Sequence, residues 1–207
     1  MGLGQRLGFY SRKITGALDH TRPVWIHGAS VGEALAAARL VGEIGQRFPT
    51  RKIVVSVFTA TGYETARRVI SDAVVIFLPL DHPWCVRRAL STFDPSVMIF
   101  LETEIWPNML RLAHRRGTPT LLLSGRFSAR SFTQYSLLGW FFRGVIRNFA
   151  SMGMQSEEDA SRAKMLGADP DRVSVTGNLK LAGPENTFDE DLVSPESIDR
   201  ERKFHGH

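Results

Sequence analysis

Residues 24–33 read Val24-Trp25-Ile26-His27-Gly28-Ala29-Ser30-Val31-Gly32-Glu33, in which an apolar strand runs into a turn of small residues and then into a helix. In an open parallel sheet such a turn lies at the carboxyl edge, where ligands bind. The small residues leave room for a ligand beside the backbone. Ser30 followed three residues later by Glu33 fits a capping box at the start of the helix. The same carboxylate fits a catalytic base at the mouth of a site, and the spacing by itself leaves both interpretations open.

The rest of the chain alternates between strand-like and helix-like segments, judged by the spacing of apolar residues. The predicted strands span residues 24–27, 52–58, 74–78, 97–101, 120–124, 151–155 and 173–176. The predicted helices span residues 33–48, 63–71, 84–92, 106–116, 128–147 (with a break at Gly139) and 157–166. This alternation predicts an α/β fold, a Rossmann-like parallel sheet with helices on both faces.

The 207 residues divide by charge near residue 183. Residues 1–183 carry 23 basic and 14 acidic side chains, and such a surface favours anionic partners such as nucleic acid, acidic lipid or a phosphorylated sugar. Residues 184–207 are acidic and poor in large apolar residues, so we expect a disordered tail there. Cys85 is the only cysteine, which excludes an internal disulfide, and no apolar run is long enough to span a bilayer.

Two later strand ends also carry polar side chains. Glu102 and Glu104 alternate after the fully apolar strand, so one should face the cleft, where burial and mutual repulsion could raise the pKa of one carboxyl. The alternative is that Glu104 caps a helix with Pro107 near its first position, while Glu102 is solvated. Lys180 follows the last strand, where a cation can bind phosphate or carboxylate, although Gly-Asn before it also fits a simple turn.

A hydrolase is a competing interpretation of the first turn. Gly28, Ser30 and Gly32 match the Gly-x-Ser-x-Gly pattern of a nucleophile elbow, whose partners follow in the order acid, then histidine. His82 is the one histidine placed well for that role, and it precedes the candidate acids instead of following them. The order of residues therefore argues against a serine hydrolase.

Several motifs resemble, in order and spacing, those of one family. They are His27-Gly28-Ala29-Ser30-Val31-Gly32-Glu33, Thr59-Ala60-Thr61-Gly62, Pro79-Leu80-Asp81, Glu102-Thr103-Glu104-Ile105-Trp106-Pro107-Asn108, Arg126-Phe127-Ser128-Ala129-Arg130-Ser131, Gln155-Ser156-Glu157-Glu158-Asp159 and Thr176-Gly177-Asn178-Leu179-Lys180. From about Arg6 to Lys180 the chain resembles the N-terminal half of the 3-deoxy-D-manno-octulosonic acid (Kdo) transferases. The resemblance implies the N-terminal half of a two-domain GT-B glycosyltransferase. Such an enzyme moves Kdo from CMP-Kdo onto a lipid A precursor in lipopolysaccharide assembly, with inversion.

The resemblance also implies roles for individual residues. Glu33 would be the general base that takes the proton of the acceptor hydroxyl, a poor nucleophile until it loses that proton. Glu102 and Lys180 would stabilise the transition state. The positions implied to bind the acceptor are Ser30, Gly32, Glu104 and Arg126. The resemblance implies no metal, no cofactor and no nucleic-acid partner.

On this resemblance, residues 1–183 form the acceptor-binding domain, and the family's donor-binding C-terminal domain and apolar N-terminal anchor have no counterpart in the chain. We therefore expect a truncated product, a fragment or a divergent single-domain relative that works with a separate C-terminal domain. The alternative function is a non-catalytic module that binds anionic glycolipid, or half of a split enzyme.

Residues 131–143 are dense in aromatic side chains, and the arginines that flank or end this segment are Arg126, Arg130, Arg143 and Arg147. A basic amphipathic segment with Trp and Phe can lie in a bilayer interface, whereas a helix that covers a sheet needs bulky residues too. The first interpretation, together with the resemblance, predicts a peripheral protein at the cytoplasmic face of the bacterial inner membrane.

Overall fold

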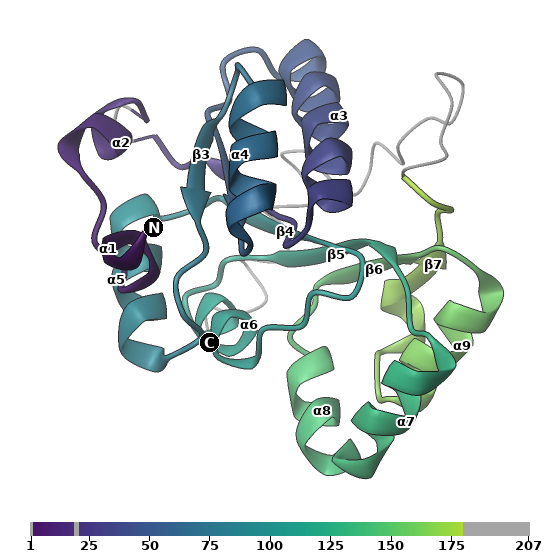
Figure 1. Ribbon diagram of the computed structural model, residues 1–207. Helices are drawn as coiled ribbons and strands as arrows, with labels where there is room; N and C mark the ends of the chain where they lie inside the picture. The colour runs from purple at the N-terminus through teal and green to yellow at the C-terminus, as the bar shows by residue number, and fades with distance from the viewer. Residues whose placement is uncertain (1, 19–20, 180–207) are drawn as a thin grey trace.

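A seven-stranded, fully parallel sheet runs through the computed structural model, which describes residues 2–18 and 21–179 (Figure 1). The sheet order is β3-β2-β1-β4-β5-β6-β7. The strands are β1 Val24–His27, β2 Ile53–Val57, β3 Val74–Phe77, β4 Val97–Leu101, β5 Thr120–Gly125, β6 Ser151–Met154 and β7 Val173–Val175. The predicted α/β class and parallel sheet are confirmed. The acidic segment 184–207 lies outside the described residues.

Helices connect the strands, as the apolar spacing predicted. They are α1 Leu3–Arg6, α2 Arg12–Gly16, α3 Val31–Arg47, α4 Ala60–Val69, α5 Pro83–Phe93, α6 Pro107–Arg115, α7 Ala129–Leu137, α8 Gly139–Ile146 and α9 Glu157–Met165, with a short 3₁₀ turn at Pro170–Arg172. α3 begins earlier than the expected Glu33, because Ser30 is its N-cap and the helix starts directly after the cap.

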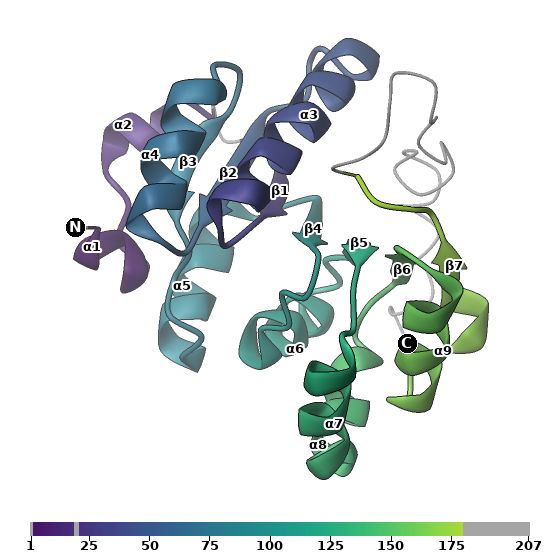
Figure 2. The same ribbon diagram turned by 45° about the vertical axis from the view of Figure 1, so that its right-hand side comes forward.

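The chain reverses its winding direction between β1 and β4, and the helices divide accordingly (Figure 2). Helices α3 and α4 cover one face of the sheet, and α5, α6, α8 and α9 cover the other. Alternate residues of β4 serve the two cores: Met98 and Phe100 belong to the second, and Ile99 and Leu101 to the first. A strand buried on both faces must be apolar throughout, which explains the unbroken apolar run that marks β4.

The segment 128–147 forms two helices, with the break where Gly139 suggested it. α7 ends at Leu137 and α8 begins at Gly139. The two helices form a hairpin that projects from the body of the molecule in both views (Figures 1 and 2). None of the helices in the described residues combines the length and apolar character needed to cross a bilayer.

The N-terminus of α6 is capped from a distant loop. Asp81 Oδ2 accepts a hydrogen bond from the Asn108 backbone N–H at 3.0 Å, and its Oδ1 accepts one from the Met109 N–H at 2.8 Å. The Asn108 side chain in turn donates to the Asp81 carbonyl at 2.6 Å. Pro107 lies in the first turn of α6, as expected, but the expectation that Glu104 caps this helix is wrong, because Asp81 occupies the free N–H groups.

We expect Asp81→Ala to lower the free energy of unfolding by about 1–3 kcal/mol, because it leaves two helix N–H groups without their acceptor. Asp72→Ala is the matched control, since Asp72 is an exposed aspartate in the loop between α4 and β3. Urea denaturation measures both variants. Equal midpoints for the two would contradict the capping role of Asp81.

Candidate functional site

Glu33 and Glu102 follow the carboxyl ends of two neighbouring strands. β1 pairs in parallel with β4, with His27 opposite Phe100, and the winding direction reverses between these two strands. This reversal creates the topological switch point where ligands bind in open α/β sheets. Arg126, an exposed side chain, follows the next strand, β5, at the same edge. Lys180 lies outside the described residues.

The capping box is present, so that interpretation of Ser30 and Glu33 is confirmed. Glu33 Oε2 accepts hydrogen bonds from the backbone N–H groups of Ala29 at 2.5 Å and Ser30 at 3.2 Å. Ser30 Oγ accepts a bond from the Glu33 N–H at 3.4 Å. Both backbone bonds go to Oε2, so the capping box does not require Oε1. Capping and base catalysis are therefore compatible at this residue.

Gly28 makes room for Glu33 and not for a ligand, which corrects one expectation for this turn. A Cβ atom at position 28 would lie 2.8 Å from Glu33 Cβ, closer than side chains tolerate. The glycine thus allows the first turn of α3 to fold back against the end of β1. Gly32, in that first turn, is partly exposed, as is Ser30.

Burial and a neighbouring charge act together on Glu33. The side chain is only 8 % exposed, and this desolvation is the largest effect that raises the pKa of Glu33. The negative charge of Glu104 raises the pKa of Glu33 further, whereas the bonds from Ala29 and Ser30 oppose both effects. The net shift is upward, which increases the affinity of the carboxylate for a proton, as a general base requires.

The two carboxylates after β4 differ in their surroundings. Glu104 Oε2 accepts a bond from Trp106 Nε1 at 2.8 Å and lies 3.3 Å from His27 Nε2. Glu102 adopts the left-handed φ of 57°, and its backbone N–H donates to the Leu123 carbonyl at 3.0 Å. The loop after β4 brings Glu104 toward the end of β1, and its negative charge helps to raise the pKa of Glu33.

Sequence reasoning missed three polar residues that build this site: His27, Ser56 and Trp106. His27 and Ser56 are fully buried and face each other across β1 and β2, with His27 Nδ1 3.0 Å from Ser56 Oγ. A histidine and a serine inside otherwise apolar strands were the available signal, since buried polar groups require partners.

The hydrolase interpretation has no support at Ser30. Its φ of −106° is ordinary extended backbone, not the strained turn of a nucleophile elbow, and its hydroxyl caps α3. His82, the proposed partner, is the N-cap of α5 and accepts a bond from the Trp84 N–H at 3.3 Å.

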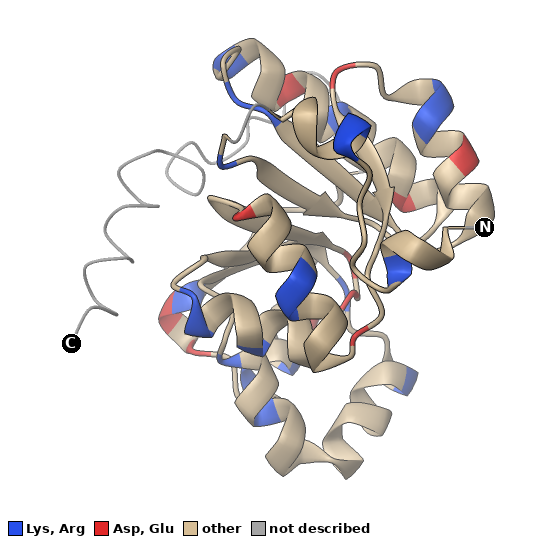
Figure 3. Cartoon of the chain, turned by 90° about the vertical axis from the view of Figure 1, so that its left-hand side faces the viewer, with Lys and Arg blue, Asp and Glu red and all other residues tan. Residues whose placement is uncertain are grey.

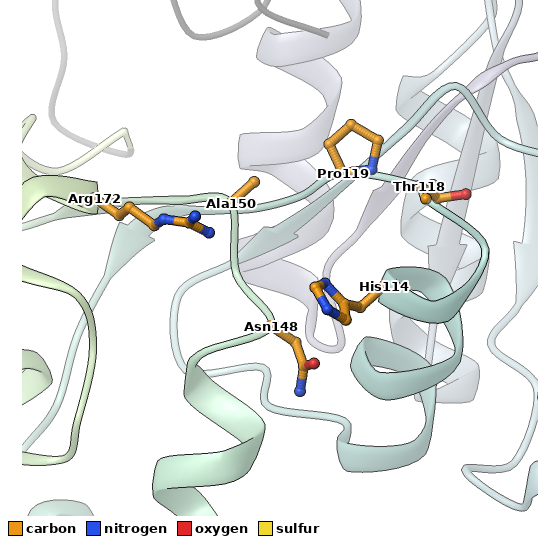
Figure 4. A pocket seen from close by; sticks show the side chains of 7 residues that line it. His114, Thr118, Pro119, Asn148, Ala150 and Arg172 are labelled. Carbon is orange, nitrogen blue, oxygen red and sulfur yellow. The ribbon is translucent and has the colours of Figure 1, made fainter. Parts of the chain in front are cut away.

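A pocket opens at the opposite, amino edge of the sheet (Figure 4). Its polar lining comes mainly from His114, Asn148 and Arg172, which precede β5, β6 and β7. Glu33, Glu102 and Glu104 follow the other ends of the strands, so this pocket is separate from the candidate site.

The fold and the site together define a Rossmann-like α/β domain of the GT-B kind, with a buried carboxylate at the switch point. The model of the 3-deoxy-D-manno-octulosonic-acid transferase (kdotransferase) family matches residues 1–182, and the chain belongs to this family of glycosyltransferases. It is 32% identical over 197 residues to a 3-deoxy-D-manno-octulosonic acid transferase of Haemophilus influenzae. The matched region covers 95% of this chain and 45% of that protein. It is 35% identical to the protein of the same name from Bordetella pertussis, covering 77% of this chain and 38% of that one.

The chain spans less than half the length of these relatives. Among solved structures it is similar to the UDP-GlcNAc 2-epimerase of Neisseria meningitidis, with a TM-score of 0.56 at 15% identity over 77% of this chain and 47% of that one. A putative UDP-N-acetylglucosamine 2-epimerase from Listeria monocytogenes gives a TM-score of 0.56 at 10% identity, covering 76% and 46% of the two chains. At these identities the likeness supports the fold alone.

We expect Glu104→Gln to lower the pKa of Glu33, because the substitution removes the negative charge that helps to raise it. Glu33 should then lose its proton at lower pH than in the unmodified chain. Carbon NMR of the labelled Glu33 carboxyl, followed through a pH titration, measures the shift. Glu43→Gln, an exposed change on the same helix, should leave the titration where it was. An unchanged or raised Glu33 pKa in Glu104→Gln would contradict the coupling.

Proposed function

We propose that this chain forms the acceptor-binding domain of an enzyme that transfers Kdo from CMP-Kdo to a lipid A precursor. The observation that carries the proposal is the state of Glu33: a buried carboxylate at the switch point, held through one oxygen by two backbone N–H groups. Membership of the Kdo transferase family supports the choice of donor and acceptor.

In this proposal Glu33 takes the proton from the acceptor hydroxyl as that oxygen attacks the anomeric carbon of Kdo. The bond from that carbon to the phosphate oxygen of CMP breaks in the same step, and CMP leaves with the electron pair. The backbone bonds to Oε2 fix the carboxylate, so Oε1 is the oxygen that receives the proton. The raised pKa suits the role, because a more basic carboxylate accepts a proton more readily.

The remaining site residues have supporting roles in the proposal. Lys180 stabilises the charge that develops on the CMP phosphate or the Kdo carboxylate, and Glu102 stabilises the transition state from the end of β4. The acceptor is bound by the side chains and backbone of Ser30, Gly32, Glu104 and Arg126. These residues follow β1, β4 and β5, adjacent strands that end at one edge.

The α7–α8 hairpin supplies the membrane contact in this proposal. Its tip exposes Leu137, Leu138, Trp140 and Phe141, of which Trp140 is 82% exposed, while Phe132, Tyr135 and Phe142 pack against the core. The segment 126–148 contains four arginines and no acidic residue. In Figure 3 the ribbon is coloured blue at arginine and lysine positions and red at acidic ones. A hairpin that combines an apolar tip with several arginines is suited to bind at the surface of an anionic bilayer.

The hairpin also lies close to the edge of the sheet that carries the candidate site. Burial and the charge of Glu104 both raise the pKa of Tyr135 on α7, so this helix lies within electrostatic range of the site. A bilayer that receives the hairpin tip would hold a lipid-anchored acceptor near Glu33. On this proposal the protein acts peripherally at the cytoplasmic face of the bacterial inner membrane.

Glu33→Gln should reduce Kdo transfer by about 10²–10⁴-fold, because the amide cannot accept the proton. The amide oxygen can still accept the bonds from Ala29 and Ser30, so the cap and the fold should persist. The assay contains the chain, CMP-Kdo and a lipid A precursor, with and without a supplied donor-binding domain.

Glu43→Gln serves as the control for this assay, since Glu43 is exposed on the same helix. Near-normal transfer by Glu33→Gln would restrict Glu33 to capping. Precursor binding without transfer under every condition, including with the unmodified chain, would favour a non-catalytic glycolipid-binding module.

The membrane role predicts that the chain sediments with anionic vesicles at low salt and is released at high salt, because salt screens the arginines. Trp140→Ala/Phe141→Ala should weaken partitioning by about tenfold or more, since burial of one large apolar side chain contributes roughly 1.5–3 kcal/mol. Met165→Ala, an exposed apolar change on α9, should have little effect. If the chain does not sediment with vesicles at low ionic strength, the hairpin tip has another partner.

A further inference from the structure

A chain of polar side chains crosses the core and ends at the candidate site. It begins at Trp25, passes through Ser56 and His27, and reaches Glu104 and Trp106. Trp25, Ser56 and His27 are all 0% exposed. Such a chain is stable only if each donor meets an acceptor, so the position of every hydrogen can be followed along it.

The hydrogen bonds along this row of side chains can all be donated in the same direction, from Trp25 toward Glu104. Trp25 Nε1 is a donor only, so Ser56 Oγ accepts its bond, at 2.8 Å. The single Ser56 hydroxyl hydrogen then has two acceptors within reach, His27 Nδ1 at 3.0 Å and the Ile26 carbonyl at 3.4 Å. The shorter contact leaves His27 Nδ1 without a proton of its own. The neutral ring then carries its proton on Nε2, where it donates to Glu104 Oε2 at 3.3 Å.

The tautomer of His27 that carries its proton on Nδ1 satisfies these hydrogen-bond partners less well. With the proton on Nδ1, His27 would donate to the Ser56 carbonyl at 3.0 Å, an oxygen that already accepts the Gly28 N–H at 3.1 Å. Nε2 would then face the charged Glu104 carboxylate without a hydrogen, which costs more than the contact of an unprotonated Nδ1 with the neutral Ser56 carbonyl in the Nε2–H form. The arrangement therefore favours the Nε2–H form.

Glu104 is held at one oxygen as a result. Both His27 Nε2 and Trp106 Nε1 donate to Oε2. Two donors on one oxygen restrict rotation of the carboxylate and leave Oε1 as an acceptor. A sugar hydroxyl is the donor that such an oxygen suits.

We propose that His27 is a positioning residue: Ser56 keeps its proton on Nε2, and that N–H holds Glu104 so that the other carboxylate oxygen receives a hydroxyl of the sugar acceptor. His27 touches no substrate itself, because it is fully buried. The inference rests on the proposed function, since it assumes that the acceptor binds at this edge.

Nitrogen NMR of the histidine rings in the 207-residue chain tests the position of the proton without any activity. We expect the His27 ring hydrogen on Nε2 and none on Nδ1, and the signal is assigned by its loss in His27→Gln. Ser56→Ala removes the hydroxyl donor and should move the ring toward the Nδ1–H form, whereas Ser56→Thr keeps a hydroxyl and should not. A ring that is protonated on Nδ1 in the unmodified chain would overturn the proposal, and so would an unaltered spectrum in Ser56→Ala.

Binding of a lipid A precursor to the same chain tests the positioning role. His27→Leu removes the donor and should weaken binding by about tenfold, the effect of losing one hydrogen bond to a charged group. His27→Gln retains an N–H at about the Nε2 position and should bind within a few-fold of the unmodified chain. Equal affinity of the Leu and Gln variants would overturn the positioning role, provided that both give the circular dichroism and urea midpoint of the unmodified chain. If the unmodified chain binds no precursor, both the proposed acceptor site and the positioning role of His27 are wrong. The NMR experiment still tests the position of the His27 proton, because it needs no ligand.

Discussion

The reversal of winding between β1 and β4 is the constraint on which the rest of this structure depends. Crossovers between parallel strands are right-handed, so a chain that builds β1, β2 and β3 in one direction and then returns beside β1 must place its later helices on the other face. The connections after β1 and β4 consequently leave the sheet toward opposite faces. Glu33, from the connection after β1, and Glu104, from the connection after β4, therefore lie close enough for the charge of one to act on the other.

Beside the ends of β1 and β4, the pKa of Glu33 depends on electrostatic effects that oppose one another. Burial and the charge of Glu104 favour the protonated carboxyl, while two backbone N–H groups favour the carboxylate. Because burial is the largest effect, the balance lies on the side of a raised pKa. The backbone hydrogen bonds that limit the rise in the pKa of Glu33 also hold its carboxylate in one orientation. A residue that caps a helix can in this way also be a well-placed base.

The site and the α7–α8 hairpin form one functional edge in our proposal. α7 begins directly after β5, whose end lies beside that of β4, and Tyr135 lies within range of the Glu104 charge. The aromatic residues of this segment divide between two tasks: Phe132, Tyr135 and Phe142 attach the hairpin to the core, and Trp140 and Phe141 remain exposed. The core interpretation of the segment thus applies to its packed residues, and our proposal assigns the interface role to the exposed ones.

The sequence by itself determined the features that depend on neighbouring residues. The strands and helices follow from local periodicity, the capping box from the spacing of Ser30 and Glu33 within one helical turn, and the break before α8 from Gly139. Only the tertiary structure decided the pairing of residues far apart in the chain: Asp81 and not Glu104 caps α6, and His27 lies between Ser56 and Glu104. The reason is physical, because such partners are selected by the register of parallel strands and the path of the loops, and a local pattern carries neither.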